Sequence, residues 1–166
     1  MEVPLKTAMK VSCICPTYNR PPRSQWLLEE AIESFLRQDY PDKELLVLND
    51  CPGQELLCDA PDVFVINLPR RFHSYGEKLN AGVALAQRSL IALWNDDDIM
   101  LPWRLSKSLE RLADAGYYNP QVYWFLDPAG LHHAHQPTTQ PAVPKIITAD
   151  TRATTSKQIC GDNAKK

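Results

Sequence analysis

IALWNDDD, residues 91–98, is an apolar run that ends abruptly in one amide and three adjacent carboxylates. Its first four residues do not alternate between apolar and polar, which is typical of a strand buried on both faces of a parallel sheet. Three neighbouring aspartates concentrate negative charge, which is costly unless a cation neutralises it. The nearest basic residue in sequence is Arg104. The stretch therefore predicts a buried parallel strand that ends in a row of acidic oxygens.

Two interpretations of this acidic row are open. Hard divalent cations such as Mg²⁺ or Mn²⁺ prefer oxygen ligands, often one or two carboxylates together with the phosphates of a substrate. In open α/β sheets, ligands bind just outside the carboxyl ends of the strands, where the row would lie. The alternative is an acidic turn that leads into a helix, since Pro102 suits a first helical position.

Length and composition restrict the class of protein. A chain of 166 residues is long enough for one domain with a core and too short for two. The net charge of −2 does not fit a nucleic-acid-binding surface. No apolar run approaches the ~20 residues of a membrane span, and the N-terminus lacks a signal-peptide pattern. The five cysteines form no zinc pattern. We therefore expect a reduced, cytoplasmic protein with no transmembrane segment and no nucleic-acid partner.

Strand and helix patterns alternate along the chain after a lead-in of residues 1–10. The predicted strands are residues 11–15, 44–48, 63–68, 89–94 and 121–126. The predicted helices are residues 24–38, 76–87 and 102–114, with a short one at 54–58. This alternation predicts a mainly parallel sheet with helices on both faces.

The composition changes after Phe125, the last of the fourteen aromatic residues. Residues 136–166 are rich in Thr, Ala, Pro and Lys and have little to bury. We expect them to form a poorly ordered tail.

Polar clusters follow three of the predicted strands, at residues 17–20, 49–50 and 95–98. Because the carboxyl ends of parallel strands meet at one edge of a sheet, these clusters should converge. No glycine-rich dinucleotide turn follows the first strand, and no phosphate-binding lysine loop is present. The pattern indicates a site that holds a nucleotide by its base and ribose, and its phosphates through a metal.

Four ordered segments carry a resemblance to a known family: VSCICPTYNR, ELLVLND, GEKLNAGVALA and IALWNDDDIMLPWRL. Together they resemble the nucleotide-binding half of the family 2 glycosyltransferases, which have the GT-A fold. The match covers roughly residues 10–126. It implies an α/β, Rossmann-like GT-A domain over residues 11–135, with an acceptor-binding half that is truncated or replaced.

The resemblance also assigns residues to the donor nucleotide. Those expected to border the nucleobase are Pro16, Thr17, Tyr18 and Arg20. Asp50 would accept hydrogen bonds from the base or ribose, and Asp96 would lie near the ribose. The family has a basic residue just before Asn80, where this chain has Leu79, so Lys78 would supply that charge. The alternatives are that Asn80 is a polar residue on an outer helix face and that Lys78 is a solvated helix lysine.

Asp97 and Asp98 are the expected ligands of Mn²⁺ or Mg²⁺ on the diphosphate, with Asp97 favoured. Many relatives space this motif as Asp-x-Asp, and here Asn95 takes the place of the first acid. His132, His133 and His135 lie on a predicted loop, where the alternative to metal binding is simple exposure.

The resemblance implies metal-dependent transfer of a sugar from a nucleotide-diphosphate-sugar donor to the hydroxyl of an unknown acceptor. The catalytic base is unassigned, and Asp127 is the only nearby acid in the part of the sequence expected to be ordered. One alternative is a non-catalytic nucleotide-sugar-binding remnant. Another is a nucleotidyltransferase, which would usually have a glycine-rich loop after its first strand.

Overall fold

The computed structural model describes residues 9–87, 89–113, 115–120, 122–135 and 146–148. The strands are β1 (Val11–Thr17), β2 (Lys43–Asn49), β3 (Val63–Asn67), β4 (Leu90–Leu93), β5 (Tyr117–Tyr118), β6 (Val122–Asp127), β7 (Gly130–His135) and β8 (Ile146–Thr148). The helices are the 3₁₀ helix η1 (Pro22–Ser24) and the α-helices α1 (Gln25–Leu36), α2 (Tyr75–Leu85) and α3 (Arg104–Leu112).

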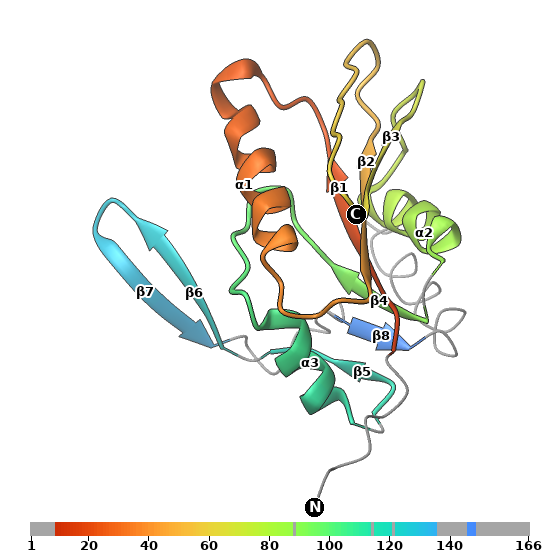
Figure 1. Cartoon of the computed structure of the whole chain (residues 1–166). Coiled ribbons are helices and arrows are strands. Elements are labelled where there is room, and N and C mark those ends of the chain that lie inside the picture. Colours follow the sequence, from red (N-terminus) through yellow and green to blue (C-terminus); the bar gives the residue numbers. More distant parts are fainter. Residues whose placement is uncertain (1–8, 88, 114, 121, 136–145, 149–166) are drawn as a thin grey trace, which may run out of the picture.

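Among the described residues, the main sheet has the strand order β3-β2-β1-β4-β8-β5. The four strands β1 to β4 pair in parallel, whereas β8 pairs antiparallel with both β4 and β5. β1 therefore lies inside the sheet, between β2 and β4 (Figure 1). The prediction of a mainly parallel sheet is confirmed.

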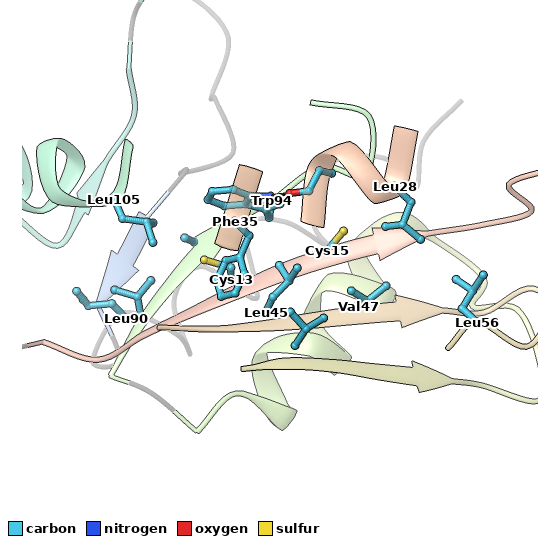
Figure 2. Close-up of a cluster of buried hydrophobic side chains, with 14 of the residues drawn as sticks. Cys13, Cys15, Leu28, Phe35, Leu45, Val47, Leu56, Leu90, Trp94 and Leu105 are labelled. Atoms are coloured by element: carbon cyan, nitrogen blue, oxygen red, sulfur yellow. Dashed lines mark hydrogen bonds between the residues drawn. The ribbon is translucent and has the colours of Figure 1, made fainter. Parts of the chain in front are cut away.

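Helices cover both faces of the parallel strands. On one face, α1 lies over Cys13 and Cys15 of β1, and Leu105 of α3 belongs to the same apolar cluster (Figure 2). On the other face, Leu79 of α2 packs with Ile14 of β1 and Leu48 of β2. Because strand residues alternate between the two faces and both are covered, all seven residues of β1 are buried. This explains the unbroken apolar runs in the sequence.

α2 approaches the sheet unusually closely, and its start is well defined. The Ser74 hydroxyl accepts the Glu77 N–H at 3.1 Å, and the Glu77 carboxylate accepts the His73 N–H at 2.9 Å. These bonds satisfy amide groups that the helix itself leaves free. One turn further on, a Cβ atom at Gly82 would lie 2.5 Å from Ile14 Cγ2. Only glycine allows this separation, so Gly82 sets how deeply α2 lies on the sheet.

Trp94 anchors the chain where β4 ends and the acidic row begins. It is fully buried, its indole Nε1–H donates to the Ala31 carbonyl at 3.0 Å, and its ring meets Phe35 edge-on. Both partners lie in α1, so α1 and the end of β4 are held together by one large side chain. The acidic row therefore leaves the sheet from a rigid point.

The predicted fifth strand forms, but not in the parallel sheet. It is β6, which pairs antiparallel with β7 in a separate two-stranded sheet (Figure 1). A two-residue turn joins the strands, and Gly130 after it adopts φ +133°. A turn this short can only join antiparallel neighbours. The expectation of a loop for His132, His133 and His135 was wrong, because all three lie in β7.

Two further differences concern residues whose pairing is not local. No helix forms at residues 54–58. Residues 146–148, within the segment expected to be a tail, form β8 in the main sheet. The rest of residues 136–166 and the lead-in before residue 9 lie outside the described residues.

Candidate functional site

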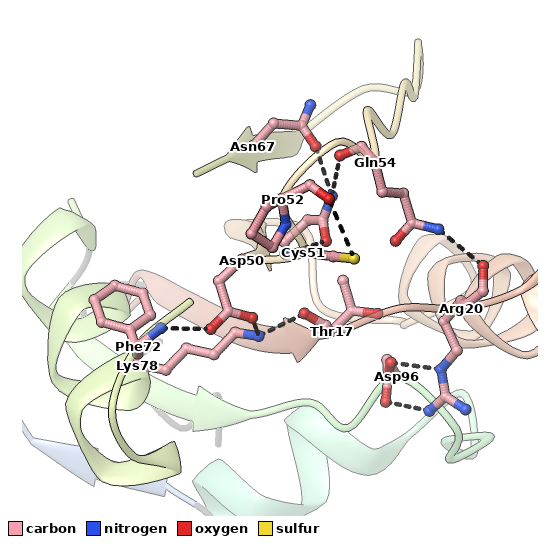
Figure 3. Close-up of polar contacts among 11 residues, drawn as sticks. Thr17, Arg20, Asp50, Cys51, Pro52, Gln54, Asn67, Phe72, Lys78 and Asp96 are labelled. Atoms are coloured by element: carbon pink, nitrogen blue, oxygen red, sulfur yellow. Dashed lines mark hydrogen bonds and ion pairs between the residues drawn. The ribbon is translucent and has the colours of Figure 1, made fainter. Parts of the chain in front are cut away.

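The polar strand ends meet at one edge of the main sheet. In the sheet register, Thr17 at the end of β1 lies beside Asn49 at the end of β2, and Asn49 lies beside Asn67 at the end of β3. β4 runs in the same direction and continues into the acidic row, residues 96–98. Figure 3 shows the side chains that connect these ends. The structure thus brings together the three polar clusters of the sequence.

Asp50, the first residue after β2, is buried and hydrogen-bonded to Lys78 and to the Phe72 N–H; we call this group of three residues the Asp50 cradle. It is 3% exposed, and its Oδ1 accepts from Lys78 Nζ at 2.5 Å while its Oδ2 accepts the Phe72 N–H at 3.0 Å. Lys78 Nζ also donates to the Thr17 carbonyl at 2.5 Å. Burial acts to raise the pKa of Asp50, but Lys78 and the Phe72 N–H outweigh it and hold the pKa below its ordinary value. Asp50 is therefore an oriented, ionised carboxylate.

Arg20 joins the loop after β1 to the acidic row. Its Nε lies 2.8 Å from Asp96 Oδ2 and its Nη2 lies 2.6 Å from Asp96 Oδ1, and Nη2 is also 3.4 Å from Asp97. Hydrogen bonding with Asp96 raises the pKa of Arg20 above its ordinary value. Arg104 is the nearest basic residue in sequence, but the cation that the structure places at the row is Arg20. Arg20, 76 residues from Asp96 in sequence, neutralises part of the row.

The remaining acids of the row differ in what they offer to a ligand. The Asp97 side chain is 55% exposed. Asp98 accepts a hydrogen bond from Asn95 Nδ2 at 2.7 Å. Among the described residues, no group of three or more His, Cys, Asp and Glu could hold a metal ion on its own. A cation that also binds phosphate oxygens needs only one or two carboxylates, and Asp97 with Asp98 fits that donor set.

Tyr75, the first residue of α2, belongs to this edge although the sequence did not single it out. Partial burial, together with nearby groups that include the carboxylates of the row, raises its pKa to about 12. The phenol is therefore a neutral hydrogen-bond donor beside the row. No spacing or motif marks it, because a tyrosine at a helix start is an ordinary surface residue.

An amide network braces the loop that follows β2. Asn49 donates to the Gln54 carbonyl at 2.8 Å and to Asn67 Oδ1 at 2.9 Å, and Asn67 exchanges two bonds with the Leu56 backbone. These bonds tie the backbone of Gln54 and Leu56 to the strand ends, which explains why the predicted short helix is absent. Gln54 Nε2 then donates to the Arg20 carbonyl at 2.9 Å. Gln54, missed by sequence reasoning, thus connects the loops after β1 and β2. Beside it is an open hollow of about 340 Å³, lined by Cys51, Gly53, Gln54, Glu55, Asn67, Leu68 and Pro69.

The residues expected to border a nucleobase lie at the end of β1 and directly after it. Pro16 and Thr17 are buried within the strand. Thr17 Oγ1 has no hydrogen-bond partner among the residues the structure describes. Tyr18 is 39% exposed, and the Arg71 guanidinium lies 4.0 Å from the centre of its ring. Arg71 thus covers one face of the Tyr18 ring in a cation–π contact.

Three other candidates have distinct positions. The interpretation of Lys78 as a solvated helix lysine was wrong, since it is 5% exposed. Asn80 lies half-buried in α2. Asp127 ends β6, in the hairpin sheet and not in the sheet that carries the other residues. Within the described part of the chain, no helix is long and apolar enough to cross a membrane.

The fold and the site define a GT-A-like α/β protein with carboxylates at the carboxyl edge of a parallel sheet. A family model described as glycosyl transferase family 2 matches residues 12–164, and the chain belongs to that family.

Two relatives agree with this assignment. The chain is 32% identical over 114 residues to an uncharacterized glycosyltransferase, YwdF, of Bacillus subtilis, covering 66% of this chain and 40% of the relative. It is 33% identical over 116 residues to the GalNAc(5)-diNAcBac-PP-undecaprenol beta-1,3-glucosyltransferase of Campylobacter jejuni, covering 65% and 36%. The chain therefore spans about two fifths of the length of these relatives.

The mannosyltransferase PcManGT from Pyrobaculum calidifontis, solved with GDP-Man and Mn²⁺, has a similar structure. Its TM-score is 0.55 at 20% identity, over 75% of this chain and 37% of that one. This likeness concerns the fold.

Proposed function

We propose that this chain holds the nucleotide-diphosphate-sugar donor of a glycosyl transfer to an acceptor hydroxyl, with a divalent cation on the diphosphate. The observation that carries the proposal is the common edge at which the Asp50 cradle and the Arg20–Asp96 pair lie. Both are charged, largely buried and oriented, and a core has no need of two such groups at a single sheet edge.

The nucleoside would interact with the residues at the ends of β1 and β2. Asp50 would accept a hydrogen bond from the base or ribose, since each of its oxygens keeps a lone pair beyond the bonds described. Pro16, Thr17 and Tyr18 would border the base, and Asp96, fixed by Arg20, would lie near the ribose. Asn80 would be a further residue of the donor site, because it lies in α2 close to Lys78 in sequence.

Asp97 and Asp98 would hold Mn²⁺ or Mg²⁺ together with the donor's phosphates. A bound cation supplies Lewis-acid stabilisation of the charge that grows on a leaving diphosphate, an effect of several kcal/mol. The half-exposed Asp97 is the first of the two that a cation from solvent would meet. The mannosyltransferase of similar fold was solved with Mn²⁺ and a nucleotide sugar, which supports this choice.

Sugar transfer also needs a base for the acceptor hydroxyl, and such a base typically contributes ~10²–10⁴-fold. Asp127 is the weak candidate, in a hairpin outside the main sheet. That position favours a second candidate function, in which the chain binds the donor and transfers its sugar poorly or not at all. The cytoplasmic location expected from the sequence stays a prediction.

A nucleotide-sugar panel separates these functions. The protein is incubated with UDP-, GDP-, ADP-, CDP- and dTDP-sugars and Mn²⁺, while calorimetry measures binding and a coupled assay measures free nucleoside diphosphate. Binding of one class, lost with chelator, is the expected result. Failure of all classes to bind with Mn²⁺ present would overturn the proposal. Efficient, saturable transfer that is abolished by Asp127→Asn would reject the second candidate function. It would identify Asp127 as the base.

A further inference from the structure

Lys78 is a buried cation that binds two groups of the protein. It lies in the first turn of α2, its side chain is 6% exposed, and the side chain of its partner Asp50 is 4% exposed. Its Nζ donates to Asp50 Oδ1 and to the Thr17 carbonyl, each at 2.5 Å. A lysine side chain that meets a diphosphate from solvent would keep its ammonium exposed. Figure 3 shows that this ammonium instead points toward the Thr17 carbonyl, at the end of β1, and toward Asp50, directly after β2.

The pair is not explained by stability alone. Taking an ammonium and a carboxylate out of water carries a large desolvation cost, and their mutual attraction roughly offsets it. Apolar residues of similar size stabilise such positions equally well or better. What the pair does supply is a fixed direction for the Asp50 carboxylate, because Lys78 holds one oxygen and the Phe72 N–H holds the other. The two donors come from separate segments, so the carboxylate plane cannot rotate without breaking one bond.

We propose that Lys78 is a positioning residue, which aims Asp50 at the nucleoside part of the donor and does not itself meet the diphosphate. Its second bond, to the Thr17 carbonyl, fixes the end of β1 against the same group. Lys78 thereby joins the two strand ends that would enclose the nucleoside. The inference rests on the proposed donor binding and adds how that binding is prepared.

The test compares ligands with and without a nucleoside. UDP, GDP, ADP, CDP, dTDP and inorganic pyrophosphate are titrated with Mn²⁺ into the wild type, Lys78→Met and Asp50→Asn, and into the double variant. Lys78→Met should lower the affinity for the preferred nucleoside diphosphate about tenfold or more, because losing a hydrogen bond to a charged group typically has an effect of that size. Pyrophosphate affinity should change less than about twofold, because its ligands are elsewhere. In the Asp50→Asn background, Lys78→Met should add less than about twofold, as expected for a residue that acts through Asp50.

Controls separate positioning from folding. Lys107→Met is the matched variant, because Lys107 is 63% exposed and pairs only with Glu110 in the contacts described. Lys78→Arg keeps the buried charge for the case in which Lys78→Met does not fold, and its longer guanidinium should misplace Asp50 and lower nucleoside binding alone. Circular dichroism checks each fold.

Three results would overturn the inference. The first is an equal loss of affinity for pyrophosphate and for nucleoside diphosphate, and the second is an unchanged affinity for nucleoside diphosphate in the folded Lys78 variants. The third is that Lys78→Met lowers the affinity as much in the Asp50→Asn background as in the wild type. A wild type that binds no nucleoside diphosphate would instead reject the proposed function.

Discussion

Arg20 and Asp96 form a two-point ion pair, with Nε 2.8 Å from Oδ2 and Nη2 2.6 Å from Oδ1. Parallel bonds of this kind fix both side chains in one plane and are stronger than single contacts between neutral groups. The same guanidinium lies 3.4 Å from Asp97. Arg20 is thus a counter-ion of the acidic row within the protein itself. A divalent cation bound at the row would be repelled by the Arg20 guanidinium.

Replacing Arg20 should therefore change metal and nucleotide binding in opposite directions. In Arg20→Met the row loses its counter-ion, and we expect Mn²⁺ alone to bind several-fold more tightly. Nucleoside diphosphate with Mn²⁺ should bind more weakly, because Asp96 is no longer oriented. Electron paramagnetic resonance of free Mn²⁺ and calorimetry measure the two. Arg37→Met, which removes a surface pair with Glu33, is the control. Parallel changes in both affinities would contradict this expectation.

Asp97→Asn should remove the metal dependence of nucleotide binding while the fold is retained. Asp97 is 55% exposed, so its loss should alter the unfolding free energy by no more than about 0.5 kcal/mol. Calorimetry with Mn²⁺ and with chelator should give the same weak affinity in the variant. The exposed Asp59→Asn serves as the matched control. If Asp97→Asn binds as the wild type does, the row is a turn and not a metal site.

Gly82→Ala should destabilise the fold although alanine normally favours a helix. The new methyl group would lie 2.5 Å from Ile14 Cγ2 and 2.8 Å from Leu48 Cδ1, so α2 or both side chains must move. Overpacking of this kind typically costs about 1–3 kcal/mol. Urea unfolding measures the change, and Ala84→Ser on the exposed side of α2 should change it much less. A more stable Gly82→Ala would show that α2 is not tightly seated.

The Asp50 cradle makes stability depend on pH in an acidic window. The folded pKa of Asp50 is lowered from 3.8, so the unfolded chain binds the proton more readily. The stability that ionised Asp50 contributes to the folded state is therefore fully present above about pH 4 and is lost as the pH falls through the folded pKa. We expect the difference in unfolding free energy between wild type and Asp50→Asn to be constant at neutral pH and to shrink below pH 4. A difference that is flat down to pH 2 would mean that another group carries the acid dependence.

The sequence predicts the parallel core well because its signals are local. Unbroken apolar runs such as residues 44–48 mark strands covered on both faces, and strand ends in a parallel sheet must share an edge. These two facts alone bring Asp50 and the acidic row together. They act within windows of a few residues, which one sequence displays directly.

What the sequence could not predict depends on partners that lie far apart in the chain. Arg20 was expected at a nucleobase, but nothing local indicates that it pairs with Asp96. Lys78 follows a helical pattern that normally leaves a lysine exposed, and only the depth set by Gly82 buries it. The bracing by Gln54 uses a backbone carbonyl, which has no sequence signature. The pairing of β6 is different, because its signal was local: the two-residue turn after Asp127 makes β6 and β7 an antiparallel hairpin.

The strand β8 has a consequence for how the protein is made. It pairs with β4 and β5, so the edge of β4 stays uncovered until residues 146–148 have emerged from the ribosome. An uncovered edge of Leu90–Leu93 is a template for pairing with other chains. Synthesis at about 5–20 residues per second leaves it open for several seconds while β5 to β7 are translated. A nascent chain in this interval therefore presents an open strand edge that the complete sheet covers.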